Sequence, residues 1–342
     1  MKVLVVHPGP HFSVADVHNG LVKGLEQNGC TVATLNLDDR LEFYGAAHIK
    51  GKKAFSKDQA CMMAAQGIEV ACYEFWPDVV VVMSGWFIPP KTWGILAKRP
   101  HHVVYWCTES PYEDDRQARP ARYVDTVVLN DPTNLEHYRA NINERTFYLP
   151  HSYDPAVHHP GPGQADLECD FGFVGTGFPS RLDYLEDVDW TGIDVKLGGN
   201  WKYTQPDSPL RDFLVHGIDQ CMNNTVTADL YRSSTVSANL YRKEHSPDAN
   251  ADGWAMGPRE VELAACETFF LRESRPEGDD LFPMLPIVGD PDDFGVKLRW
   301  WLAHDAERIE AAQAARAAIK DRTFVNTAAQ LLNLVDEAPV AA

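Results

Sequence analysis

Short, unbroken apolar runs constrain the fold of this chain more than any other feature. Three of them are Val3–Val6, Val79–Met83 and Val103–Cys107, and a segment with helical spacing, Val14–Asn28, follows the first. Strands that are apolar on both faces are typical of parallel sheets covered by helices on either side. The pattern therefore predicts α/β units built around parallel, doubly wound sheets.

The runs fall into two sets, which predicts two Rossmann-like domains. Residues 151–168 contain three prolines and no apolar periodicity, so we read them as a linker. A chain of 342 residues is also longer than one ordinary core. In such sheets ligands bind beyond the carboxyl ends of the strands, so we expect the site in a cleft between the domains. The further expected strands are Thr31–Leu37, Thr126–Leu129, Phe147–Leu149, Asp170–Val174, Asp194–Leu197, Val236–Leu240, Thr268–Leu271 and a run near Pro286–Val288.

The C-terminal part of the sequence reads as helical. One helix is expected from Asp292 to Ala303, and an alanine-rich helical segment from Ala306 to Val335. Residues 321–324 are a candidate break in that segment.

Charge and cysteine usage narrow the class of protein. The net charge is −18, and so acidic a surface repels a phosphate backbone, which argues against a nucleic-acid partner. No run of 18 apolar residues occurs, so we expect no membrane span. The seven scattered cysteines never show CxxC spacing, which favours reduced thiols in a cytoplasmic protein and no zinc site.

The stretch Met256–Glu273 carries the first candidate site. Gly257-Pro258 starts a short helix in which Arg259 and Glu262, three residues apart, share a face near the N-terminus. A helix N-terminus with a guanidinium suits a phosphate, and a carboxylate one turn on can accept sugar hydroxyls. The alternative is a surface Arg–Glu pair.

Two glycine-rich turns follow expected strands of the second domain. Gly175 and Gly177 precede Arg181, and this combination fits a diphosphate, although a tight turn with a solvent-facing arginine is the alternative. Gly199-Asn200 follows the next strand, where a base or sugar could lie. The alternative there is a turn with Trp201 packed in the core.

Three further candidates complete the set. Arg242 and Lys243 follow a buried strand. We interpret them either as ligands of a diphosphate or as part of a solvated loop. His11, in the first loop, is a candidate base, although a loop histidine is often incidental. Glu109 lies just past a strand, where a sheet presents catalytic groups, and we read the acidic run at 113–115 after it as a solvated helix start.

Other chemistries have no support. GxGxxG, GxSxG, GxxxxGK[ST] and HExxH motifs do not occur. Two DxD triplets, Asp187–Asp189 and Asp290–Asp292, follow no buried strand, so we read them as solvated turns and expect no metal ion and no cofactor.

The ordered motifs resemble the GT-B glycosyltransferases, and within them the spore-maturation, CgeB-like group and related phage-encoded enzymes. The resemblance rests on Asp170–Gly175 with Arg181, on Asn239-Leu240, and on the Arg259-x-x-Glu262 helix with its run of small residues. It implies a C-terminal helix crossing back to the N-terminal domain. It implies that Arg181, with Arg242 or Lys243, meets the donor diphosphate and that Glu262 binds the ribose with Arg259 nearby.

The sequence departs from that group at several positions. Glu267 stands where the group usually has glycine, and Trp254 stands where many retaining enzymes carry a second glutamate. Thr108–Pro111 replaces an expected Asp-Asp-Pro turn, where Glu109 is the substitute. The stereochemical outcome therefore stays open.

We expect a cytoplasmic, metal-independent, hexosyltransferase-like enzyme that uses a nucleoside diphosphate sugar as co-substrate. Residues 1–155 would bind the acceptor, joined by a helix at about 322–342, and residues 165–321 would bind the donor. The resemblance favours a protein or glycan acceptor. Two alternatives to this function remain open at this point: a nucleotide-sugar epimerase of the same fold, and a non-catalytic module that binds a nucleotide or glycan. An acceptor on DNA is a third possibility, since a local groove could bind DNA despite the overall charge.

Overall fold

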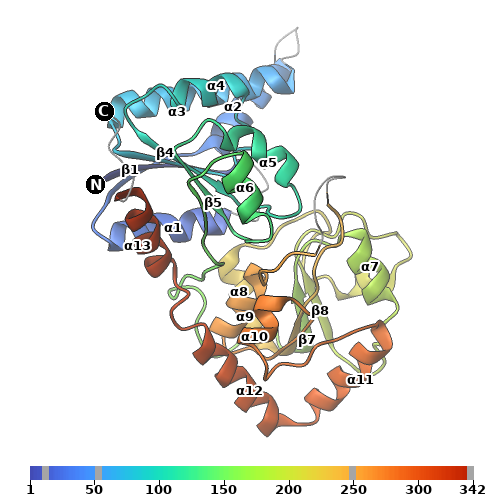
Figure 1. The fold of residues 1–342 in the computed structure, drawn as a ribbon. Coiled ribbons are helices and arrows are strands. Elements are labelled where there is room, and N and C mark those ends of the chain that lie inside the picture. The colour runs from blue at the N-terminus through green and yellow to red at the C-terminus, as the bar shows by residue number, and fades with distance from the viewer. Residues whose placement is uncertain (10–14, 51–55, 246–251, 337–342) are drawn as a thin grey trace. The chain divides into compact units, whose positions relative to one another are not determined.

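A computed structural model describes residues 1–9, 15–50, 56–245 and 252–336, and these form two compact units (Figure 1). The first unit contains Met1–Pro150 together with the C-terminal helix α13 (Phe324–Asp336). The second contains His151–His245 and Trp254–Thr323. Residues 252 and 253 also belong to the first unit, and two of the passages between the units lie between Pro150 and His151 and between Thr323 and Phe324.

The first unit is built on a six-stranded parallel sheet in the order β2-β1-β3-β4-β5-β6. The unbroken valines of the third strand are fully buried, as expected for a sheet covered on both faces. The strands are β1 (Lys2–Val6), β2 (Thr31–Leu35), β3 (Val79–Met83), β4 (His102–Cys107), β5 (Thr126–Leu129) and β6 (Thr146–Tyr148).

Helices cover both faces of this sheet. Val80 and Val82 point into a core that includes Ile68 of α3, whereas Val79 and Val81 point into a core that includes residues of α1 and α13. Helices α1 and α13 pack closely against each other, and this close approach requires glycine at position 24. A Cβ on Gly24 would lie 2.3 Å from the carbonyl oxygen of Phe324. The helices are α1 (Ala15–Gln27), α2 (Leu37–Lys50), α3 (Lys57–Phe75), α4 (Pro90–Leu96), α5 (Asp114–Ala121), α6 (Leu135–Asn141) and α13.

The second unit has a four-stranded parallel sheet in the order β10-β9-β7-β8. Phe171 and Phe173 of its central strand are fully buried in one core with residues of the surrounding helices. The elements are β7 (Cys169–Val174), α7 (Pro179–Glu186), β8 (Val195–Gly198), a 3-10 helix (Pro209–Phe213), α8 (Asn224–Ser233), β9 (Ser234–Asn239), α9 (Pro258–Ala265), β10 (Phe270–Arg272), α10 (Pro276–Leu281), α11 (Pro291–Leu302) and α12 (Asp305–Ala318).

The expected strands and helices agree with the structure to within one or two residues at most ends, with two corrections. The second strand ends at Leu35 rather than residue 37, because α2 begins at Leu37. The expected run near Pro286–Val288 forms only one parallel bridge, between Arg272 and Ile287. The predicted break in the C-terminal helical segment is confirmed, since α12 ends at Ala318 and α13 begins at Phe324.

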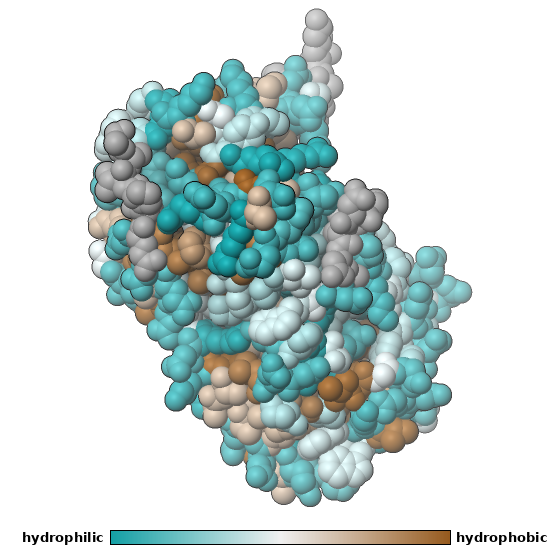
Figure 2. Space-filling model, in the orientation of Figure 1, coloured by the Kyte–Doolittle hydropathy of each residue, from teal (hydrophilic) through white to brown (hydrophobic). Residues whose placement is uncertain are grey.

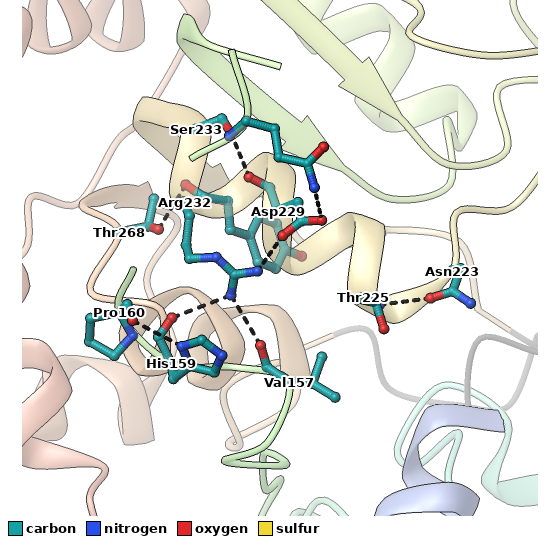
Figure 3. Close-up of polar contacts among 11 residues, drawn as sticks. Val157, His159, Pro160, Asn223, Thr225, Asp229, Arg232, Ser233 and Thr268 are labelled. Atoms are coloured by element: carbon teal, nitrogen blue, oxygen red, sulfur yellow. Dashed lines mark hydrogen bonds and ion pairs between the residues drawn. The ribbon is translucent and has the colours of Figure 1, made fainter. Parts of the chain in front are cut away.

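The proline-rich segment that we read as a linker is fastened to α8 of the second unit (Figure 3). Nη1 of Arg232 donates to the carbonyl oxygens of Val157 at 3.1 Å and His159 at 3.3 Å, while Nη2 pairs with Asp229. The hydroxyl of Ser233 accepts from the backbone N–H of residue 164 at 2.8 Å. Residues 157–164 are therefore part of the second unit rather than a free tether.

Candidate functional site

The carboxyl ends of β7 and β8 are joined by their glycines. The N–H of Gly175 donates to the carbonyl of Gly198 at 3.0 Å, and that of Gly177 donates to the carbonyl of Asn200 at 2.9 Å. Gly199 has a φ of +101°, and a Cβ there would lie 2.2 Å from the carbonyl oxygen of Gly175. Only glycine fits this crossing of two loops. Trp201 is fully buried beneath it, so the alternative reading of that turn is correct for the tryptophan.

Arg181 is built into the loop that follows β7. Its Nε donates to the carbonyl of Leu240 and its Nη1 to the carbonyl of Thr176, both at 2.9 Å, and the residue is buried. The side chain thus ties the β7 loop to the end of β9. The solvent-facing arginine of the alternative reading does not occur here.

Arg259 reaches the same place from α9. Its Nε donates to the carbonyl of Val174 at 2.6 Å, and its guanidinium lies 4.6 Å from the ring centroid of Phe173. A Cβ on Gly175 would lie 2.4 Å from Nη2 of Arg259 and 3.4 Å from Nη1 of Arg181. Two guanidinium groups therefore flank one glycine at the carboxyl edge of the sheet, an arrangement suited to an anionic ligand.

The N-terminus of α7 is used by a side chain of the protein itself. The carboxylate of Glu244 accepts from the N–H of Ser180 at 2.9 Å and from its hydroxyl at 3.0 Å. Burial alone would raise the pKa of Glu244, but these hydrogen bonds outweigh it and lower the pKa. A diphosphate at this helix end has to compete with an ionised carboxylate, which the sequence did not reveal.

The other two cations predicted after β9 have different environments. The guanidinium of Arg242 lies 5.7 Å from the ring centroid of Phe178, a ring that Arg181 also approaches at 5.4 Å. Arg242 is half-buried within this group, whereas the side chain of Lys243 is exposed. Arg242 thus belongs to the same edge as the two guanidinium groups at Gly175.

Helix α9 presents its two acidic residues to different neighbours. Oε2 of Glu262 lies 3.5 Å from the hydroxyl of Tyr231 on α8, and Glu262 is half-buried. Glu260 is fully buried: it accepts from the N–H of Gly257 at 2.8 Å and from the hydroxyl of Tyr241. Burial raises the pKa of Glu260 to about 7, against the opposing effect of these hydrogen bonds and of the nearby arginines.

Glu260 is a residue that the sequence reasoning missed. Its position three residues after the helix-capping Gly257 is the spacing of a capping box, and that signal was available. Tyr241, whose hydroxyl donates to Glu260, directly precedes Arg242 and Lys243 in the chain. The guanidinium of Arg275 lies 4.3 Å from the centroid of the same tyrosine ring.

In the first unit, Glu109 lies just after β4, as predicted. It is half-buried, its N–H donates to Oε1 of Gln117 at 3.2 Å, and its carbonyl accepts from the N–H of Glu113. The reading of the following acidic run is wrong for one residue, because Asp114 is buried. Burial raises the pKa of Asp114 even though Ser110, Asn134 and Gln117 donate to its carboxylate.

His11 lies outside the described residues. Near the end of β1 the structure instead shows His7 and His18 with ring centroids 4.9 Å apart, and burial lowers the pKa of both. In the sequence, these two histidines flank the loop that contains His11.

The acidic triplets considered for metal binding contain residues that cap a helix or pair with an arginine. Oδ1 of Asp290 accepts from the N–H of Asp293 at 2.9 Å as the cap of α11, and Asp189 pairs with Arg299 at 3.1 Å. Within residues 1–9, 15–50, 56–245 and 252–336, no three histidine, cysteine, aspartate or glutamate side chains gather where they could hold a metal ion. Nor does any helix in those ranges have the length and apolarity needed to span a bilayer.

Sequence comparison finds a similarity to glycosyltransferases in the second half of the chain. Residues 181–333 match a family model described as glycosyl transferase-like. The spore protein CgeB of Bacillus subtilis (strain 168) is 19% identical over 245 residues, which are 70% of this chain and 77% of that protein.

Solved structures share the fold over nearly the whole chain. The sucrose-phosphate synthase of Thermosynechococcus elongatus superimposes with a TM-score of 0.66 at 11% identity, covering 98% of both chains. HepE of Anabaena in complex with UDP-glucose gives 0.64 at 12%, covering 98% of this chain and 99% of that one. An α-glucosyltransferase in complex with UDP and a 13-mer DNA containing an HMU base gives 0.66 at 10%, covering 98% and 100%. The fold is therefore GT-B, as predicted.

Proposed function

We propose that this glycosyltransferase of the GT-B fold moves a hexosyl group from a nucleoside diphosphate sugar to an acceptor hydroxyl without a metal ion. One observation carries the proposal: the guanidinium groups of Arg181 and Arg259 flank Gly175 at the carboxyl edge of the second sheet. Ligands of parallel α/β sheets bind at that edge. A diphosphate can approach the backbone there and have its charge balanced by two arginines.

The chemistry assigns a role to each group. As the bond between the anomeric carbon and the diphosphate oxygen breaks, charge develops on the leaving diphosphate, and Arg259, Arg181 and Arg242 stabilise it. Lys243 is exposed and adds charge at the rim. The carboxylate of Glu262 accepts hydrogen bonds from the ribose hydroxyls. The acceptor oxygen bonds to the anomeric carbon and gives its proton to a general base, for which Glu109 is the candidate.

The first donor to test is UDP-glucose. HepE of Anabaena was solved with UDP-glucose, and the DNA-bound α-glucosyltransferase was solved with UDP. These proteins share only the fold with this chain, so they support the choice of probe. For the acceptor we propose a protein, which the resemblance to the CgeB-like group supports and which the net charge of −18 favours over DNA.

The experiment measures UDP release from UDP-glucose, with and without EDTA, in the wild type, Arg259→Ala and Arg181→Ala. Each substitution should lower turnover by roughly 10²-fold, the effect of removing one charge-stabilising group. EDTA should change nothing. Arg299→Ala is the matched control, because Arg299 is an arginine of the same unit that pairs with Asp189 instead of flanking Gly175. Unchanged turnover in Arg259→Ala would overturn the assignment.

Three outcomes would replace parts of this proposal. Conversion of the nucleotide sugar without any acceptor would identify an epimerase. Binding of UDP-glucose with neither transfer nor hydrolysis would identify a binding module. Transfer of labelled glucose to duplex DNA rather than to protein would correct the acceptor class.

A further inference from the structure

The carboxylate of Glu277 joins two distant segments of the second unit. Its Oε2 accepts from the backbone N–H of Met256 at 2.9 Å, and its Oε1 accepts from Nη2 of Arg322 at 2.5 Å. Glu277 is 4% exposed, so its carboxylate is largely shielded from water, although the guanidinium of Arg322 is partly exposed. A buried carboxylate with a charged partner on one oxygen and an amide on the other is held in a single geometry.

On one side, Glu277 fixes the entry to α9. Besides the side-chain contact to Met256, the N–H of Glu277 donates to the carbonyl of Trp254 at 3.1 Å. Gly257, the next residue after Met256, caps α9. The helix that begins there carries Arg259 and Glu262, so their positions depend on where this entry segment lies.

Through its contact with Arg322, Glu277 also binds the segment where the chain passes from the second unit to the first. The carbonyl of Arg322 accepts from the N–H of Tyr153 at 2.9 Å, and Tyr153 forms a parallel bridge with Thr323. Two of the passages between the units lie between residues 150 and 151 and between residues 323 and 324. Arg322 therefore lies beside these two passages.

We propose that Glu277 is a positioning residue that holds the start of α9, and with it the donor-binding Arg259 and Glu262, against the crossover segment at Arg322. The inference rests on the proposed donor site. An uncharged amide in place of the carboxylate has one acceptor oxygen for two donors, the buried N–H of Met256 and the guanidinium of Arg322. A buried donor that loses its acceptor costs enough free energy to shift the local structure. A shift of the α9 entry would move the groups that bind the diphosphate and the ribose.

The test compares Glu277→Gln and Arg322→Met with the wild type. We expect UDP to bind about tenfold more weakly to each, measured by isothermal titration, and amide hydrogen exchange in residues 254–262 to become faster without ligand. The double variant should lose no more than the weaker-binding single variant, because both changes remove one interaction. Arg322→Lys, which keeps the charge, should restore part of the affinity.

Asp229→Asn is the matched control, because it weakens another partly buried ion pair of the same unit, that with Arg232 (Figure 3). It should lower the melting temperature and leave UDP affinity and exchange in residues 254–262 unchanged. Glu277→Gln and Arg322→Met proteins that bind UDP and exchange like the wild type would overturn the inference. Failure of the proposed function looks different, since the wild-type protein itself would then bind no UDP.

Discussion

Nη1 of Arg259 donates to Oδ1 of Asn239 at 2.7 Å, which joins the helix α9 to the end of strand β9. Asn239 is 2% exposed, so this hydrogen bond to a charged group forms away from water. This hydrogen bond orients the guanidinium of Arg259 toward Gly175. The structural role of Asn239 is therefore to position Arg259.

Asn239→Ala should therefore weaken the binding of UDP. A hydrogen bond to a charged group contributes about 1.5–3 kcal/mol, so we expect roughly tenfold weaker binding or more, measured by titration calorimetry. Asn223→Ala is the control: it removes the side chain that caps α8 by accepting from Thr225 at 2.8 Å (Figure 3). That change should lower stability by about 1 kcal/mol and leave the affinity for UDP intact. Equal affinities in wild type and Asn239→Ala would contradict the role.

Gly199→Ala should destabilise the second unit strongly. The new Cβ would lie 2.2 Å from the carbonyl oxygen of Gly175, and the φ of +101° is unfavourable for alanine. We expect a loss of more than about 2 kcal/mol in the free energy of unfolding, measured with urea. Gly192→Ala separates the two causes, because Gly192 has a φ of +74° with nothing within 4 Å of a Cβ. That variant should lose only about 1 kcal/mol; similar losses in both would show that the contact with Gly175 does not matter.

Glu260 should make stability depend on pH. Its pKa is raised from 4.5 to about 7 in the folded protein, so the folded state binds the proton more tightly than the unfolded chain does. The resulting stabilisation is fully present below pH 4.5 and is lost as the pH rises to about 7, and it amounts to about 3 kcal/mol. Glu260→Gln keeps an amide oxygen as acceptor and cannot titrate.

The measurement for Glu260 is urea unfolding of both proteins at intervals between pH 4.5 and 8. The wild type should lose stability relative to Glu260→Gln across that window. Parallel curves would mean that the carboxyl group titrates with an ordinary pKa in the folded state.

Glu109→Gln should slow transfer without affecting donor binding. Loss of a general base lowers turnover by roughly 10²-fold or more, whereas the UDP affinity depends on the second unit. The readouts are kcat with UDP-glucose and an acceptor, and the Kd of UDP. Glu113→Gln is the control, because its carboxylate pairs with Arg116 at 3.5 Å in the same segment. If both variants keep wild-type turnover, the base lies elsewhere, and Asp114 becomes the next residue to substitute.

The sequence by itself determined the elements and their order. Unbroken apolar runs such as Val79–Met83 gave strand bounds that agree with the structure, and the break before Phe324 was visible as well. These features are local, because backbone propensity and the burial pattern of a strand depend on neighbouring residues. The glycines at 175 and 199 could likewise be singled out, since a loop that needs a close approach or a positive φ has few other choices.

Tertiary structure alone decided what each charged side chain contacts. Arg181 donates to the carbonyl of Leu240 because the parallel sheet pairs β7 with β9. Glu277 contacts Arg322 although the two residues are 45 positions apart in the sequence. Asp114 is buried although it lies in an acidic run, and the carboxylate of Glu244 accepts hydrogen bonds at the N-terminus of α7. A side-chain hydrogen bond forms only when donor and acceptor lie within a few ångströms of each other. Tertiary packing decides which groups come that close, and the order of residues in the sequence does not.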